Sequence, residues 1–209
     1  TEDFVNGKLE NANKRLESRN GQIDNTASLG QFLGSHDEDG FLYLLGGNED
    51  KFKVAASLQM TAKGQPVIYY GEELGLTGKN NYPYLDNRYD MAWDQVEDND
   101  MLDHYQKLLT FRGDFSEVLS RCERSKVLGS DADKFLLFER TYQEESVHVG
   151  LNLNEEAKEI SLKLDSADAV VIDHYSDTTY ELTNDNMVSI TIPSIAQGGT
   201  ALLEVVDGK

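Results

Sequence analysis

The spacing of the hydrophobic residues changes near residue 115, and this change limits the folds open to the chain. Before that point, apolar side chains recur about every 3.6 residues in several segments, as they do on one face of an α-helix. After it, they alternate with polar residues at a period of about 2, the spacing of a strand with one buried face. We therefore expect an α/β portion over residues 1–116 and an antiparallel all-β portion over residues 117–209.

Three segments of the first portion have the pattern of amphipathic helices. Apolar residues at helical spacing over residues 5–16 predict one helix, which we expect to end at Gly21 in the left-handed conformation. A second helix is expected over residues 49–62, where Asn48 is a suitable N-cap and acidic residues occupy the first turn. Residues 99–113 carry the third helical pattern.

Short apolar runs predict the strands. The runs over residues 28–35 and 65–70 alternate with the helices along the chain, which indicates parallel βα units. In the second portion, turn-forming residues separate four alternating runs. These runs cover residues 147–153, 160–164, 188–192 and 201–205. The second portion therefore reads as an antiparallel β-sandwich.

Composition and charge narrow the class of partner. Hydrophobic residues make up 39% of the 209 positions, which is enough for a packed core. Asp and Glu number 38 against 19 Lys and Arg, and a net charge of -19 repels nucleic acid and anionic membranes. No stretch approaches the roughly 20 apolar residues of a membrane span. We expect neither nucleic acid nor membrane as a partner, while the cellular location stays open.

The segment "SLGQFLGSHDEDGFLYLLGG", residues 28–47, concentrates acidic groups and admits three interpretations. A calcium loop of the EF-hand type would place Ser35 at its first position and Gly46 at its twelfth, where Glu is needed. An ordinary acidic turn is the common case. A catalytic carboxylate is the third, because His36 and Asp37 follow a predicted parallel strand, and α/β barrels display catalytic groups at that end.

Several motifs in a fixed order support the catalytic interpretation. They are "FLGSHD", then "GQPVIYYGEELGL", then "NRYDMAWD", followed by the alternating strands. In this order they resemble the C-terminal part of the α-amylase superfamily of glycoside hydrolases, which includes amylopullulanases and neopullulanases. The resemblance implies that residues 1–116 are a C-terminal fragment of a (β/α)8 TIM barrel, containing its seventh and eighth strands. It also implies that residues 117–209 are the antiparallel β-sandwich that the family calls domain C.

The resemblance further implies a retaining α-glucan hydrolase that acts on starch-like polysaccharides. Retaining hydrolysis needs a nucleophile and a general acid about 5 to 5.5 Å apart. In the family these two carboxylates belong to the fourth and fifth strands, which we expect upstream of Thr1 in a longer protein. The third carboxylate, here Asp37, would bind sugar hydroxyls and favour the distorted ring of the transition state. His36 would donate to the same sugar.

Other candidate residues keep two interpretations each. Tyr70 and Arg88 are expected to contact substrate, but Tyr70 could be structural and Arg88 could pack at the barrel edge. Trp93 could form a stacking wall for glucose or pack at the same edge. His36 could be a core histidine, and Cys122 is expected to be a buried or idle thiol. The four histidines lack metal-ligand spacing, so we expect neither a metal nor a cofactor.

An alternative function is a non-catalytic carbohydrate-binding or interaction module, in which the sandwich docks a glucan or a partner without turnover. In either case, part of a barrel is not a closed sheet, and its strands should have unpaired edges. We expect the isolated chain to be inactive on glycosidic bonds, and either to self-associate or to rearrange these strands.

Overall fold

The computed structural model describes residues 1–79, 83, 85–183 and 185–206. The first half contains α1 (Glu2–Val5), α2 (Leu9–Asn20), η1 (Thr26–Ser28), β1 (Gly30–Gln31), α3 (Phe41–Leu44), α4 (Glu49–Met60), β2 (Gln65–Pro66), η2 (Glu72–Leu74), η3 (Trp93–Gln95), α5 (Asp100–Asp114) and α6 (Ser116–Arg121). The second half contains β3 (Glu123–Ser130), β4 (Phe135–Tyr142), β5 (Glu145–Asn152), β6 (Lys158–Lys163), β7 (Val170–Asp173), β8 (Thr178–Glu181), β9 (Met187–Ile192), η4 (Ile195–Gln197) and β10 (Thr200–Val206). Within these described ranges, no helix has both the length and the apolar character needed to cross a membrane.

The helices follow the local signals in most places. The side chain of Asn48 accepts a hydrogen bond from the backbone N–H of Lys51 at 2.8 Å, so the predicted N-cap of α4 is confirmed. The single helix expected over residues 5–16 is wrong, because Gly7 adopts a φ of +74° and separates α1 from α2. The expected left-handed cap at Gly21 is also wrong. Its φ is -68°, since its N–H continues the helical pattern by donating to the carbonyl of Glu17.

Strands β1 and β2 are parallel, as the βα order predicts, with Gly30 opposite Gln65. Both strands are shorter than expected and contain two residues each. The reason is that each strand has one neighbouring strand within the described residues. The residues beside each strand therefore have no second strand with which to form hydrogen bonds. Phe32 and Val67, which come directly after β1 and β2, are 55% and 49% exposed.

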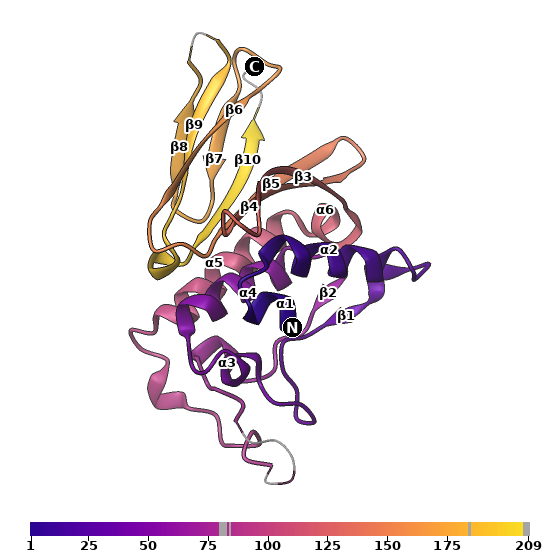
Figure 1. The fold of residues 1–209 in the computed structure, drawn as a ribbon, viewed down its shortest axis with the longest axis vertical. Coiled ribbons are helices and arrows are strands. Elements are labelled where there is room, and N and C mark those ends of the chain that lie inside the picture. Colours follow the sequence, from indigo (N-terminus) through magenta and orange to yellow (C-terminus); the bar gives the residue numbers. More distant parts are fainter. Residues whose placement is uncertain (80–82, 84, 184, 207–209) are drawn as a thin grey trace.

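All strand pairs of the second half are antiparallel, as predicted. Six strands form one sheet in the order β3-β4-β5-β10-β7-β8, and β6 and β9 form a second sheet. The four expected runs correspond to β5, β6, β9 and β10. Figure 1 shows the strands at the end of the molecule that carries the C-terminus, with the helices gathered below them.

The central strands of the six-stranded sheet are buried on both faces, and β4 is an example. Phe135 and Leu137 belong to the apolar core between the two sheets. Leu136 and Phe138, one position along, belong to the core that the sheet shares with the helices. A strand covered on both faces carries a continuous apolar run. For this reason an alternating pattern does not mark β4 in the sequence.

The core shared with the helices crosses the predicted boundary at residues 116 and 117. Phe52 of α4 and Tyr105 and Leu108 of α5 lie in the same apolar cluster as Val149 of β5 and Leu202 of β10. The helical half therefore packs directly on the sheet. The division into residues 1–116 and 117–209 stays a prediction, since this core is continuous across it.

Candidate active site

The segment that follows β1 folds into a tight turn at residues 35–38. Ser35 and Glu38 form an isolated antiparallel bridge, and the N–H of Asp37 donates to the Ser35 hydroxyl at 3.1 Å. The side chains of His36 and Asp37 are 61% and 70% exposed, so the interpretation of His36 as a core histidine is wrong. The turn presents both groups to solvent.

The carboxylate of Asp37 joins His36 and Arg88 in one cluster. Its Oδ2 lies 3.1 Å from Nε2 of His36, and its Oδ1 accepts from Nη2 of Arg88 at 3.3 Å. The guanidinium of Arg88 also donates to the carbonyl of His36 through Nε at 3.3 Å and through Nη2 at 3.1 Å. Exposed ion pairs add little stability, so the main effect of these contacts is to orient the carboxylate. Three of the four residues predicted for the site therefore meet in space.

The fourth predicted residue, Tyr70, lies beside this cluster. Its hydroxyl donates to the carbonyl of Tyr89 at 2.6 Å, and its ring packs edge-on against Tyr69 with centroids 4.7 Å apart. Tyr89 directly follows Arg88 in the chain. The contacts found for Tyr70 in the described part of the chain hold the loop that carries Arg88, whereas contact of Tyr70 with substrate stays a prediction.

Trp93 and Cys122 have opposite environments. Trp93 is 75% exposed in this chain, and both its packing at the edge of a complete barrel and the stacking wall for glucose stay predictions. Cys122 is fully buried, and burial raises the pKa of its thiol, as fits the predicted buried thiol. Within the residues that the structure describes, no group of three or more His, Cys, Asp or Glu side chains could hold a metal ion.

Asn87 is a site residue that the sequence does not reveal. Its side chain is fully buried, and its Nδ2 donates to the carbonyls of Ser35 and Glu38, each at 2.9 Å. The backbone carbonyl of Asn87 accepts from the hydroxyl of Tyr69 at 3.1 Å. A single Asn between two charged residues has no pattern that separates it from an ordinary loop Asn.

Gly40, which follows the turn, is held by backbone contact with Gly78. The N–H of Gly40 donates to the carbonyl of Gly78, and the N–H of Gly78 donates to the hydroxyl of Tyr89, both at 2.8 Å. A Cβ atom on Gly40 would lie 2.5 Å from the carbonyl oxygen of Thr77. The close approach of the two backbone segments therefore requires glycine at position 40.

Beneath the turn lies the buried carboxyl group of Glu72. It is 5% exposed, and its Oε2 accepts from the N–H of Tyr69 at 3.2 Å. A Cβ atom on Gly34 would lie 2.7 Å from its Oε1, so this carboxyl packs against the chain that leads into the turn. Burial raises the pKa of Glu72 to about 7, and the nearby charge of Glu73 adds to the rise.

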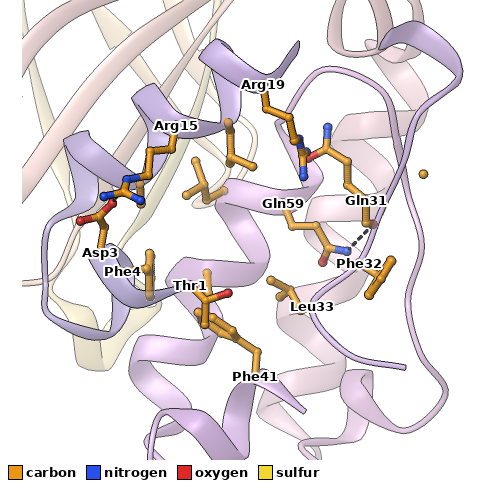
Figure 2. A pocket seen from close by; sticks show the side chains of 15 residues that line it. Thr1, Asp3, Phe4, Arg15, Arg19, Gln31, Phe32, Leu33, Phe41 and Gln59 are labelled. Atoms are coloured by element: carbon orange, nitrogen blue, oxygen red, sulfur yellow. Dashed lines mark hydrogen bonds and ion pairs between the residues drawn. The ribbon is translucent and has the colours of Figure 1, made fainter. Parts of the chain in front are cut away.

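A cavity of about 460 Å³ lies elsewhere, along β1 (Figure 2). It opens between α2, which contributes Arg15 and Arg19, and the segment that contains Gln31 and Phe32. On its floor, Nε2 of Gln59 donates to the carbonyl of Gln31 at 2.9 Å. The lining residues come from the chain before and after the turn, and the three clustered side chains are not among them.

The chain is similar to known proteins over most of its length. Residues 3–164 match the family described as alpha amylase, catalytic domain. Neopullulanase 2 of Thermoactinomyces vulgaris is 36% identical over 140 residues, which are 65% of this chain and 23% of that protein. A cyclomaltodextrinase of Geobacillus thermopakistaniensis is 33% identical over 135 residues, 64% of this chain and 22% of that protein. This chain thus spans less than a quarter of the length of either relative.

Solved structures of alpha-amylases share the fold of this chain. The alpha-amylase of Geobacillus thermoleovorans, crystallised with acarbose, superposes with a TM-score of 0.79. The match covers 97% of this chain and 44% of that structure, at 21% sequence identity. At this identity the likeness concerns the fold alone.

Proposed function

This chain belongs to the alpha-amylase family, and from that membership we propose that it is the C-terminal portion of a retaining α-glucan hydrolase acting on starch-like polysaccharides. The observation that carries the proposal is the cluster of Asp37, His36 and Arg88 on the turn after β1. The names of the relatives, a neopullulanase and a cyclomaltodextrinase, support an α-glucan as substrate.

In this proposal Asp37 stabilises the transition state without acting as nucleophile or acid. A short carboxylate that is largely exposed can accept charge-assisted hydrogen bonds from sugar hydroxyls. Contacts that strengthen as the sugar ring distorts lower the barrier, because they stabilise the transition state more than the substrate. His36 can donate to the same sugar, and Arg88 keeps the carboxylate oriented.

The nucleophile and the general acid would come from barrel strands that precede this chain in a longer protein. Two features support this part of the proposal. The parallel pair of β1 and β2 has an unpaired edge on either side within the described residues. The cavity beside β1 is the natural place for a further strand (Figure 2). Residues 117–209 would then be domain C of that protein.

A second candidate is a carbohydrate-binding module without turnover. The exposure of Trp93 and Tyr70 favours it, because open aromatic faces can stack on sugar rings. This candidate differs from the first in having no catalytic partner for Asp37. Hydrolysis by the longer protein would separate the two candidates.

The test is the substitution Asp37→Asn in a protein that carries the complete barrel. We expect the rate of starch hydrolysis to fall by about two to three orders of magnitude with little loss of folding stability, since one transition-state contact is lost and the shape is kept. Glu38→Gln, in the same turn, serves as the control and should change the rate little. Equal losses from both variants would contradict the role of Asp37.

The isolated 209-residue chain supplies the complementary test. We expect no release of reducing sugar from starch, maltooligosaccharides or pullulan, because retaining hydrolysis requires two further carboxylates. Turnover that survives purification and disappears in the Asp37→Asn variant would overturn the assignment of the chain as a fragment.

A further inference from the structure

The backbone that carries His36 and Asp37 lies outside regular helices and strands, so other contacts must define its direction. Asn87 provides two of them. It is fully buried, whereas the two side chains that it underlies are mostly exposed. A buried polar group that contacts an exposed functional turn is well placed to shape it.

The geometry of the contact is specific. A primary amide nitrogen has two N–H groups, and Asn87 uses both on the same turn. The acceptors are the carbonyls of Ser35 and Glu38, which flank His36 and Asp37 on either side, each at 2.9 Å. Since one nitrogen atom bonds to both carbonyls, their separation is fixed. The peptide units between them have little freedom to rotate.

Asn87 is itself held in place. The hydroxyl of Tyr69 donates to its backbone carbonyl at 3.1 Å, and the N–H of Tyr69 in turn donates to the buried carboxyl of Glu72. The next residue, Arg88, contacts the other side of the turn through the carbonyl of His36 and the carboxylate of Asp37. Consecutive residues therefore hold the turn by its backbone and by its functional side chain.

We propose that Asn87 is the positioning residue of the His36–Asp37 turn, and that it sets the direction in which Asp37 presents its carboxylate to a sugar. The structural half of this proposal depends on the contacts of Asn87. The catalytic half rests on the function proposed above for Asp37. The two halves are tested separately.

The chemistry of the amide suggests matched variants. Asn87→Asp keeps the shape of the side chain but replaces the donating nitrogen with an oxygen that faces two carbonyl oxygens. Asn87→Ala removes both donors, and Asn87→Gln keeps them on a longer side chain and serves if the other two variants fold poorly. Asn25→Ala, at an exposed position with no capping hydrogen bond, is the control.

The structural half is tested by amide hydrogen exchange in the 209-residue chain. We expect the protection of the amides of Asp37 and Gly40 to fall by about tenfold or more in Asn87→Asp and Asn87→Ala, and less in Asn87→Gln. The amide of Leu136 in the core of β4 reports global stability, and its exchange separates local loosening from unfolding. Unchanged protection at the turn in these variants would overturn the proposal, whatever the enzyme does.

The catalytic half is tested in the longer protein. We expect Asn87→Asp to lower kcat by about 10- to 100-fold, the size of loss that a misplaced catalytic group causes, with KM nearly unchanged. Asn25→Ala should leave both constants unchanged. A loosened turn combined with full kcat would overturn the catalytic half, and an active Asp37→Asn would in addition overturn the proposed role of Asp37. An inactive Asp37→Asn beside a fully active Asn87→Asp would overturn the catalytic half alone.

Discussion

The hydroxyl of Tyr175, in the turn after β7, donates a hydrogen bond of 2.7 Å to Nδ1 of His104 on α5. The direction follows from the other ring nitrogen. Nε2 of His104 lies 2.8 Å from the carbonyl of Lys53, which can only accept, so Nε2 carries the proton and Nδ1 is the acceptor. His104 is thus held as a neutral imidazole between the helices and the sheet.

Further hydrogen bonds connect His104 to the sheet. The hydroxyl of Ser57 on α4 lies 3.2 Å from Nε2 of His104 and 2.7 Å from the hydroxyl of Thr200 on β10. Thr200 donates to the carbonyl of Gly198 at 2.8 Å. A buried chain of hydrogen bonds therefore links α5, α4 and β10 across the predicted domain boundary.

Stability should fall in acid because of His104. Burial lowers its pKa from 6.5 to about 4, and the positive charges of Lys53 and Lys107 add to the effect. Between these values the unfolded chain binds the proton more strongly than the folded chain. The contribution is fully present above about pH 6.5 and is lost as the pH falls toward 4, with a limit of about 3 kcal/mol. Urea unfolding of the wild type and of His104→Gln between pH 7.5 and 4.5 measures this contribution as the difference between the two proteins.

His104→Gln should reduce this dependence on pH, whereas His36→Gln, at an exposed position, should preserve it. The same slope of unfolding free energy against pH in the wild type and in His104→Gln would contradict the assignment.

Glu72 should have the opposite effect on the way stability depends on pH. Its pKa is raised from 4.5 to about 7, so the folded chain binds the proton more strongly than the unfolded chain in this interval. The contribution is fully present below about pH 4.5 and is lost as the pH rises toward 7. Glu72→Gln, which is neutral at every pH, should therefore be more stable than the wild type at pH 8, by up to about 3 kcal/mol. Denaturant unfolding at pH 8 and pH 4.5 tests this.

Glu144→Gln, at an exposed position in the turn between β4 and β5, is the control for Glu72 and should show a smaller change between the two pH values. If Glu72→Gln is no more stable than the wild type at pH 8, a partner must stabilise the ionised carboxylate of Glu72 in the wild type.

Gly40→Ala should destabilise the chain by about 1 to 3 kcal/mol, because its Cβ would lie 2.5 Å from the carbonyl oxygen of Thr77. Gly113→Ala is the matched substitution in α5, where nothing lies within 4 Å of the added atom. It should stabilise the chain by about 0.5 to 1 kcal/mol, since Ala favours a helix over Gly. Thermal unfolding should show changes of opposite sign, and a neutral Gly40→Ala would contradict the tight contact at the turn.

The isolated chain should self-associate through the open edges of β1 and β2. Phe32 and Val67 are exposed beside these edges, and exposed strand edges pair readily with other chains. Phe32→Asp should shift the equilibrium toward monomer in light scattering, because an edge charge opposes pairing. Leu109→Lys removes an exposed apolar residue on α5 and should have less effect. A stable monomer at high protein concentration would contradict this expectation.

Local signals explain the parts of the fold that could be predicted. Asn48 caps α4 through a hydrogen bond to a residue three positions away, and such a contact can be read from neighbouring residues. The order of helices and apolar runs was sufficient for the parallel pairing of β1 and β2. The position of His36 and Asp37 after β1 followed from the same order, because the strand and the turn are adjacent in the chain.

The features that could not be predicted depend on contacts between residues that are far apart in the sequence. Residues 135–138 show no alternation because helices cover one face of β4 and the second sheet covers the other. Arg88 reaches Asp37 across 51 positions, and Asn87 gains its role only because the chain folds back over the turn. The sequence by itself determined the local conformations and the residue types at the site. The tertiary structure decided which polar groups are buried and paired, because burial and hydrogen bonding depend on packing between segments far apart in the chain.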